Sequence, residues 1–222
     1  MILDELAQQE LDCKIELLLW NNEPGNDELY RDILARGLRG AVSQVQLFSS
    51  PVNVGGAGRM LAADALKRKG YRGAVVMIDD DQRVAPSFVR TLRDAWSEHS
   101  YVGVWAWRIH GDYWDRSAAG AGQCATYVGT GGSIVDVSLL TDTSLRSALD
   151  SADLMLEDLL LSWRAHQLGF RVIGSDAPFD FVVDEHAQWH ALAEKKPTLY
   201  ARLGRFAPLP RDGDAEHRLS GS

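Results

Sequence analysis

The sequence predicts a mixed α/β domain in which a mostly parallel central sheet is flanked by helices. Two observations support this class. Short apolar runs rich in Val, Leu and Ile alternate along the chain with longer segments of helical composition. Glycines and polar turn residues separate the two kinds of segment. Strands that alternate with helices are expected to pair in parallel, because each helix carries the chain back to the edge where the previous strand began.

The first third of the chain follows this alternation. We expect a surface helix over residues 1–11 and a strand over 14–20, which ends in a dense cluster of turn residues. Asp27 can cap a helix over 28–36 that Gly37 ends, and a strand follows over 45–48. An Ala- and Leu-rich helix over 59–69 then ends at Gly70.

Residues 74–81 carry the most informative pattern. An apolar run typical of a buried strand is followed at once by Asp79, Asp80 and Asp81. Open α/β sheets bind ligands beyond the carboxyl ends of their strands. Adjacent carboxylates repel one another, and a divalent ion held through carboxylate and phosphate oxygens neutralises them. The pattern predicts a metal and phosphate site, and a solvated acidic turn is the alternative.

The rest of the chain is predicted in the same way. Pro86 opens a helix that runs to residue 96, and residues 101–107 have strand character. An irregular stretch covers 110–123, and an apolar segment covers 134–140 after a glycine-dense turn. A helix over 153–168 ends at Gly169, and strands follow over 171–173 and 178–183. Residues 1–207 are expected to form one domain, with a disordered tail over 208–222.

Two groups of residues have both a binding and a structural interpretation. The glycines of the Asn-Val-Gly-Gly-Ala-Gly sequence at 53–58 can bring backbone N–H groups to a phosphate, or can allow tight helix packing. The sequence matches neither the dinucleotide fingerprint nor the P-loop. Tyr113 and Trp114 can stack on a sugar or a base, or can pin their loop to the core.

Acidic and histidine side chains near the end of the chain are candidates for chemistry. Glu157 and Asp158 are favoured at a helix start by the helix dipole, and the surrounding leucines could raise a carboxylate pKa towards the range of a general base. His186 follows a predicted strand among acids, and His190 comes four residues later. Both are candidate metal ligands.

Composition excludes several classes of protein. The formal net charge of -8 and the lack of a basic stripe argue against nucleic acid as the main partner. Cys13 and Cys124 have no C-x-x-C spacing, so we expect neither a zinc site nor a disulfide, and a reducing cytoplasm fits best. The sequence has no apolar run long enough to span a bilayer and no signal-peptide pattern.

Together these motifs resemble the glycosyltransferases of GT-A fold, most closely family 2. The likeness covers residues 14–190. It rests on the order of the Trp-Asn-Asn sequence at 20–22, the glycine turn at 53–58, the Asp triplet as a DxD motif, the Gly-Thr-Gly-Gly loop at 129–132, the Glu157–Asp158 pair with Leu161 and Arg164, and a late histidine. Members of the family begin with a further β-strand that lines the nucleotide base, and this chain starts in what resembles the helix after it.

The resemblance implies transfer of a sugar from a nucleotide-diphosphate donor to a hydroxyl acceptor on a glycan, a lipid or a small molecule. Inversion by a single in-line displacement is expected, with retention as the alternative. Mn²⁺ or Mg²⁺ would bridge the donor phosphates, held by Asp81, Asp79 and His186, with His190 as the alternative third ligand. Asp158, or Glu157 beside it, would be the general base. The implied donor-binding residues are Asn22, Asn53, Gly55, Gly56, Arg59, Asp79 and Asp80, and the implied acceptor-binding residues are Trp114, Gly131 and Gly132.

Other classes fit the motifs less well. A phosphatase of the haloacid dehalogenase type requires Thr or Val where Arg83 stands. A nucleotidyltransferase requires a Gly-rich, Arg-containing loop after a first strand, which this sequence lacks. A non-catalytic relative that binds a nucleotide or a partner without turnover is the alternative that stays open.

Overall fold

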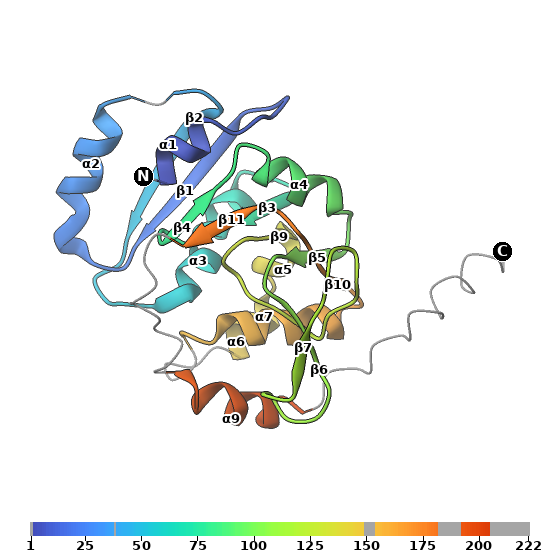
Figure 1. Ribbon diagram of the computed structural model, residues 1–222. Coiled ribbons are helices and arrows are strands. Elements are labelled where there is room, and N and C mark those ends of the chain that lie inside the picture. The colour runs from blue at the N-terminus through green and yellow to red at the C-terminus, as the bar shows by residue number, and fades with distance from the viewer. Residues whose placement is uncertain (1, 38, 149–153, 182–191, 205–222) are drawn as a thin grey trace.

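The computed structural model describes residues 2–37, 39–148, 154–181 and 192–204 (Figure 1). Helices and strands both occur throughout this part of the chain, so the mixed α/β class is confirmed. The α-helices are α1 (Ile2–Ala7), α2 (Asp27–Ala35), α3 (Gly58–Arg68), α4 (Phe88–Ala95), α5 (Val137–Leu140), α6 (Thr143–Ala148), α7 (Glu157–Gln167) and α9 (Lys195–Arg202). The strands are β1 (Ile15–Asn21), β2 (Val42–Ser49), β3 (Ala74–Met77), β4 (Gln82–Val84), β5 (Ser100–Gly103), β6 (Ala106–Ile109), β7 (Arg116–Ala118), β8 (Tyr127–Val128), β9 (Ser133–Asp136), β10 (Arg171–Gly174) and β11 (Phe179–Phe181).

The described strands do not form the single, mostly parallel sheet that the alternation of strands and helices in the sequence predicts. They form four sheets with the orders β1-β2, β10-β5-β9-β3, β11-β4 and β7-β6-β8. Within this part of the chain only β1 with β2 and β5 with β10 pair in parallel. The other pairs are antiparallel.

The antiparallel course of β9 accounts for much of this difference. Gly132 has a left-handed φ of 78°, and its N–H donates to the Met77 carbonyl at 2.9 Å. β9 then runs antiparallel between β3 and β5, with Ser133 opposite both Met77 and Gly103. The chain reverses between β6 and β8, which pair antiparallel, and β9 continues in the direction of β8 alongside β5. A parallel pairing of β9 with β5 would have needed a crossover connection.

One predicted strand is divided between two sheets. Residues 101–107 were expected to be continuous, but β5 ends at Gly103 and β6 begins at Ala106. A Cβ atom on Gly103 would lie 2.5 Å from Cγ1 of Val128, so the β5 backbone packs directly onto β8. The chain bends there, and the Val104 N–H donates to the Gly132 carbonyl at 3.0 Å.

The core lies between the four-stranded sheet and the helices α3, α5 and α7. Leu156, Leu159, Leu160 and Leu161 are fully buried, which explains why this leucine-rich stretch forms an interior helix. At the other side of the molecule, α3 approaches β1 so closely that a Cβ on Gly58 would lie 2.3 Å from Cδ1 of Trp20. Figure 1 shows β1, β2 and α2 at the upper left, and α9 at the bottom. Among the described helices, none has the length and apolar character needed to cross a membrane.

Candidate functional site

Arg59 connects two of the predicted motifs. It lies in the first turn of α3, and its guanidinium forms one salt bridge with the carboxylate of Asp79 and another with that of Glu157. The Nη1 atom lies 2.6 Å from Oε1 of Glu157. Asp79 follows β3, and Glu157 is the first residue of α7. The structure therefore brings the acidic triplet, the glycine turn and the acidic pair to one place at the carboxyl end of β3.

Glu157 is the buried member of this cluster. Its side chain is 6% exposed, and Thr130 Oγ1 donates to the same Oε1 atom at 3.0 Å. Burial raises the pKa of Glu157, while the Arg59 charge opposes this shift and the neighbouring Asp158 adds to it. A carboxylate with a raised pKa suits proton transfer near neutral pH.

Asp158 belongs to a second cluster. Lys196, in the first turn of α9, places Nζ 2.7 Å from Oδ2 of Asp158 and 3.2 Å from the Tyr127 hydroxyl. The Tyr127 hydroxyl also donates to Oδ2. Burial lowers the pKa of Lys196, but the interactions with Asp158, Tyr113 and Glu157 together outweigh burial, and the net pKa is raised. Burial and the Asp158 charge together raise the pKa of Tyr127 well above its usual value. Asp158 thus lies beside a cation and a neutral phenol.

Asp80 and Asp81 are the exposed members of the triplet. Desolvation and the charge of Asp80 raise the pKa of Asp81, as expected for neighbouring carboxylates. The residues that the structure describes contain no group of three His, Cys, Asp or Glu side chains placed to hold a metal ion. Mg²⁺ is commonly held by one or two carboxylates with substrate phosphates and water. Asp80 and Asp81 fit a cation of that kind, bound jointly with a phosphate.

The glycine turn at 53–58 packs against the chain just before α7. A Cβ on Gly55 would lie 2.3 Å from Sδ of Met155, and one on Gly56 would lie 1.8 Å from Oε1 of Glu157. The packing interpretation of these glycines is therefore supported, and phosphate binding by them stays a prediction. Asn53 caps its own turn, with Oδ1 accepting from the Gly55 N–H at 2.8 Å.

Asn22 anchors this turn to the end of β1. Its Oδ1 accepts from the Val54 N–H at 3.0 Å and from Trp20 Nε1 at 3.1 Å, and its Nδ2 donates to the Gly55 carbonyl at 3.1 Å. All of these are contacts within the protein. The structure gives Asn22 a positioning role, and its predicted contact with a donor remains a prediction.

The predicted acceptor residues lie in two places. A Cβ on Gly131 would fall 2.0 Å from Oδ2 of Asp79, so the loop at 129–132 covers the acidic turn. Trp114 is 45% exposed and contacts the edge of the Tyr113 ring. The Arg116 guanidinium lies 4.4 Å from the centre of the Trp107 ring and 4.9 Å from that of Trp114. Trp114 is thus partly held by its neighbours and still open to solvent on part of its surface.

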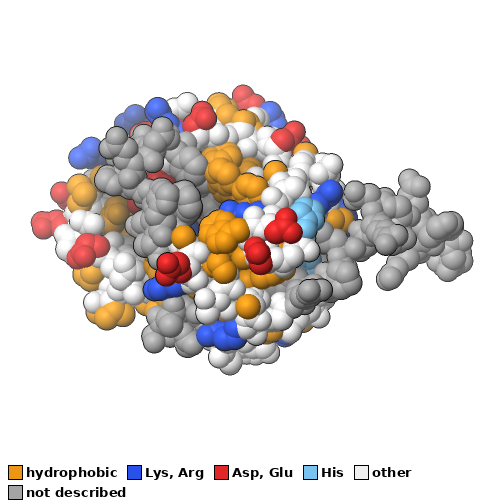
Figure 2. Space-filling model, turned by 60° about the horizontal axis from the view of Figure 1, so that its bottom comes forward, with side chains coloured by type: hydrophobic (Ala, Val, Ile, Leu, Met, Phe, Trp, Pro, Cys, Tyr) orange, Lys and Arg blue, Asp and Glu red, His pale blue; other side chains and the backbone are white. Residues whose placement is uncertain are grey.

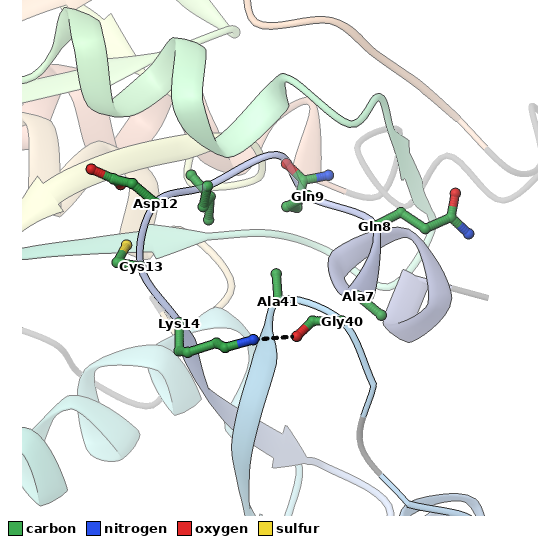
Figure 3. Close-up of a pocket in the computed structure, with 9 residues that line it drawn as sticks. Ala7, Gln8, Gln9, Asp12, Cys13, Lys14, Gly40 and Ala41 are labelled. Carbon is green, nitrogen blue, oxygen red and sulfur yellow. Dashed lines mark hydrogen bonds between the residues drawn. The ribbon is translucent and has the colours of Figure 1, made fainter.

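Other surfaces offer weaker candidates. The hollow in Figure 3 measures about 390 Å³, and no residue of the predicted motifs lines it. There Lys14 Nζ donates to the Gly40 carbonyl at 2.9 Å, so its charged group already has a partner. On the face shown in Figure 2, acidic, basic and hydrophobic side chains are interspersed.

Comparison with protein-family models and with curated proteins finds no match to this chain. His186, His190 and the tail lie outside the described residues. Sequence reasoning missed Thr130, Tyr127 and Lys196 as partners of the acidic pair. No local pattern marks them, because Lys196 is 38 positions from Asp158 and begins a helix, where a Lys is usually exposed.

Proposed function

We propose that this chain is a metal-dependent glycosyltransferase that moves a sugar from a nucleotide-diphosphate donor to a hydroxyl acceptor. The observation that carries the proposal is the bridging of Asp79 and Glu157 by Arg59. Three sequence motifs that are typical of GT-A enzymes thereby meet at the end of one strand. A GT-A relationship is part of the proposal, and the parallel β1–β2 pair and the acids directly after β3 support it.

The acidic turn is proposed as the donor side of the site. Asp81, with Asp79 or the neighbouring Asp80 and with His186 as the further ligand implied by the resemblance, would hold Mn²⁺ or Mg²⁺ together with the donor phosphates. Such an ion would neutralise negative charge on the leaving pyrophosphate. Arg59 contributes a fixed positive charge beside the same turn, and its side chain is 23% exposed. Asp79 is held by Arg59, which restricts the direction in which its carboxylate points.

The start of α7 is proposed as the acceptor side. Asp158 would remove the proton of the acceptor hydroxyl, with Glu157 as the second candidate. A base must have a free oxygen lone pair within reach of the proton. Displacement of Lys196 from Oδ2 of Asp158 would free one there, whereas in Glu157 the Arg59 and Thr130 contacts both fall on Oε1. A single in-line displacement would invert the anomeric carbon.

A second candidate function is nucleotide or partner binding without turnover. The internal partners of the acidic pair favour it, because Glu157 and Asp158 each already contact a cation. A site built only to bind has no need of a free base. Turnover separates the two functions.

The test is a thermal-shift panel of UDP, GDP, dTDP and CDP, each with Mn²⁺ and with a chelator, followed by a donor-hydrolysis assay. A ligand at about 100 times its dissociation constant adds about 2.7 kcal/mol, which corresponds to roughly 5 to 10 °C here. A shift that vanishes on chelation, with slow hydrolysis of the matching nucleotide sugar, supports the transferase. A shift without hydrolysis or transfer supports the binding protein. No shift with any nucleotide contradicts the transferase and leaves binding of a partner other than a nucleotide as the function.

A further inference from the structure

Gln82 is a buried polar side chain that none of the roles above uses. It opens β4, directly after the acidic triplet, and is 1% exposed. Its Oε1 accepts from the Asp79 N–H at 2.9 Å, which fixes the turn between β3 and β4. The carbonyl oxygen of the Gln82 carboxamide therefore holds the backbone of Asp79 in position.

The NH₂ group of the Gln82 carboxamide has no hydrogen-bond partner in the part of the chain that the structure describes. Gln82 Nε2 is buried and forms no hydrogen bond there. Buried polar groups in native proteins are almost always hydrogen-bonded, and an unsatisfied donor is costly. Such a group at the edge of a candidate site calls for a specific partner.

The surroundings of Nε2 indicate the kind of partner. It lies 3.3 Å from where a Cβ of Gly131 would stand, and Oδ2 of Asp79 lies 2.0 Å from the same point. The salt bridge of Asp79 to Arg59 uses Oδ1. A free donor and a carboxylate oxygen thus lie against the same glycine. A hydroxyl group satisfies both, because it accepts one hydrogen bond and donates another. A phosphate would satisfy only the donor and would be repelled by the carboxylate.

Gly131 is buried and covers this place. In the described part of the chain, neither its N–H nor its carbonyl forms a backbone hydrogen bond, whereas both neighbouring glycines are tied to the sheets. The peptide groups of Gly131 can therefore move with little loss of hydrogen bonding. Residues 131 and 132 are both glycine and contribute no side chain here, although Cγ2 of Val104 lies 2.6 Å from where a Cβ of Gly132 would stand.

We propose that Gln82 binds a hydroxyl group of the ligand through Nε2, next to Asp79. The ligand class is a polyol, either the ribose of a nucleotide or the sugar that it carries. This inference rests on the proposed function for the identity of the ligand. Gln82 is then a specificity residue that favours hydroxylated ligands over their deoxy forms.

The experiment follows the side-chain NH₂ resonances of Gln82 in full-length protein labelled with ¹⁵N-glutamine. Loss of these resonances in Gln82→Met assigns them. UDP, 2′-deoxy-UDP and a UDP-sugar are titrated with Mg²⁺. A shift with UDP and not with its deoxy form identifies ribose. A shift with the nucleotide sugar alone identifies the transferred sugar. In either case Gln82→Met should lower the preference for the hydroxylated ligand roughly 3- to 10-fold, as expected for one neutral hydrogen bond.

Gln123→Met is the matched control. Gln123 Oε1 accepts from the N–H three residues earlier, as Gln82 does, but its side chain is exposed and lies in the 120–123 turn. This variant should leave every ligand preference unchanged. Nucleotides could shift other resonances but not those of Gln82, with Gln82→Met keeping the wild-type preference for hydroxylated ligands. That result would show that the Gln82 inference is wrong, and it would leave the proposed transferase function unaffected. If no nucleotide binds, the proposed transferase function is wrong. The Gln82 inference is then wrong as well, unless free ribose or glucose shifts the Gln82 resonances.

Discussion

Lys196 Nζ lies 2.7 Å from Oδ2 of Asp158, and both side chains are largely buried. The contact joins α9 to the start of α7, so a residue near the end of the described chain neutralises the carboxylate proposed as the general base. Breaking a buried pair by removing one partner leaves an uncompensated charge, whereas removing both partners is far less costly.

Lys196→Met is expected to destabilise the fold by about 3 kcal/mol, because Asp158 loses its cation inside the protein. Lys196→Met combined with Asp158→Asn should recover a large part of that loss. Denaturant unfolding of the two single variants and the double variant measures the coupling. Additive effects in this cycle would show that the two groups do not interact in solution.

Glu157→Gln is expected to change how stability depends on pH. The folded-state pKa of Glu157 is raised above its ordinary value of 4.5. The folded protein therefore holds this proton more tightly than the unfolded chain, and stability is lost as the pH rises from about 4.5 through the folded pKa. Gln does not titrate, so the variant should gain stability relative to wild type across that interval. Urea unfolding from pH 4 to pH 7 tests the sign, and a constant difference between the two proteins would contradict it.

Gly56→Ala is expected to cost roughly 1 to 3 kcal/mol, the range for overpacking in a filled site. The new methyl group would overlap the Glu157 carboxylate, which Arg59 and Thr130 hold in place. Gly120→Ala is the control, because its Cβ would lie at an ordinary 3.5 Å from the nearest atom. Thermal unfolding of the two variants should differ clearly. Equal stabilities would mean that Glu157 moves aside freely.

Asp81→Ala is expected to abolish the metal-dependent part of the nucleotide thermal shift, and Asp158→Asn should keep that shift and lose sugar transfer. The first change removes a carboxylate from the proposed cation site, and the second removes the proposed base while sparing the donor side. Asp94→Ala, an exposed change on α4, serves as the control and should alter neither property. Normal donor binding by Asp81→Ala would refute the metal assignment.

Local patterns in the sequence predict most elements correctly. Residues 74–77 form a strand that leads into the acids, and residues 157–167 form a helix, because apolar spacing and turn residues act over a few positions. Strand direction is not encoded in such patterns. β9 looks like any apolar run, and its antiparallel pairing depends on the reversal of the chain between β6 and β8 and on β3 and β5 beside it.

The candidate site was predictable to a similar extent. The position of the acidic triplet after a strand follows from local patterns, whereas its meeting with the glycine turn and the acidic pair is seen only in the structure. Their internal partners were not predictable, because Arg59, Thr130 and Lys196 reach the acids across 98, 27 and 38 positions of sequence. Contacts over such separations depend on tertiary packing, which a single sequence does not display.

The separation of the β1–β2 sheet from the four-stranded sheet has a consequence for the dynamics of the molecule. No ladder bond joins the described residues of the two sheets. Side chains such as Ile15, Leu17 and Val76 share one apolar cluster instead. The β1–β2 pair therefore forms a candidate foldon that can open below the global unfolding free energy, with faster amide hydrogen exchange than β5 and β9. Because Asn22 ties β1 to the 53–58 turn, such an opening would also loosen the packing of that turn on Glu157.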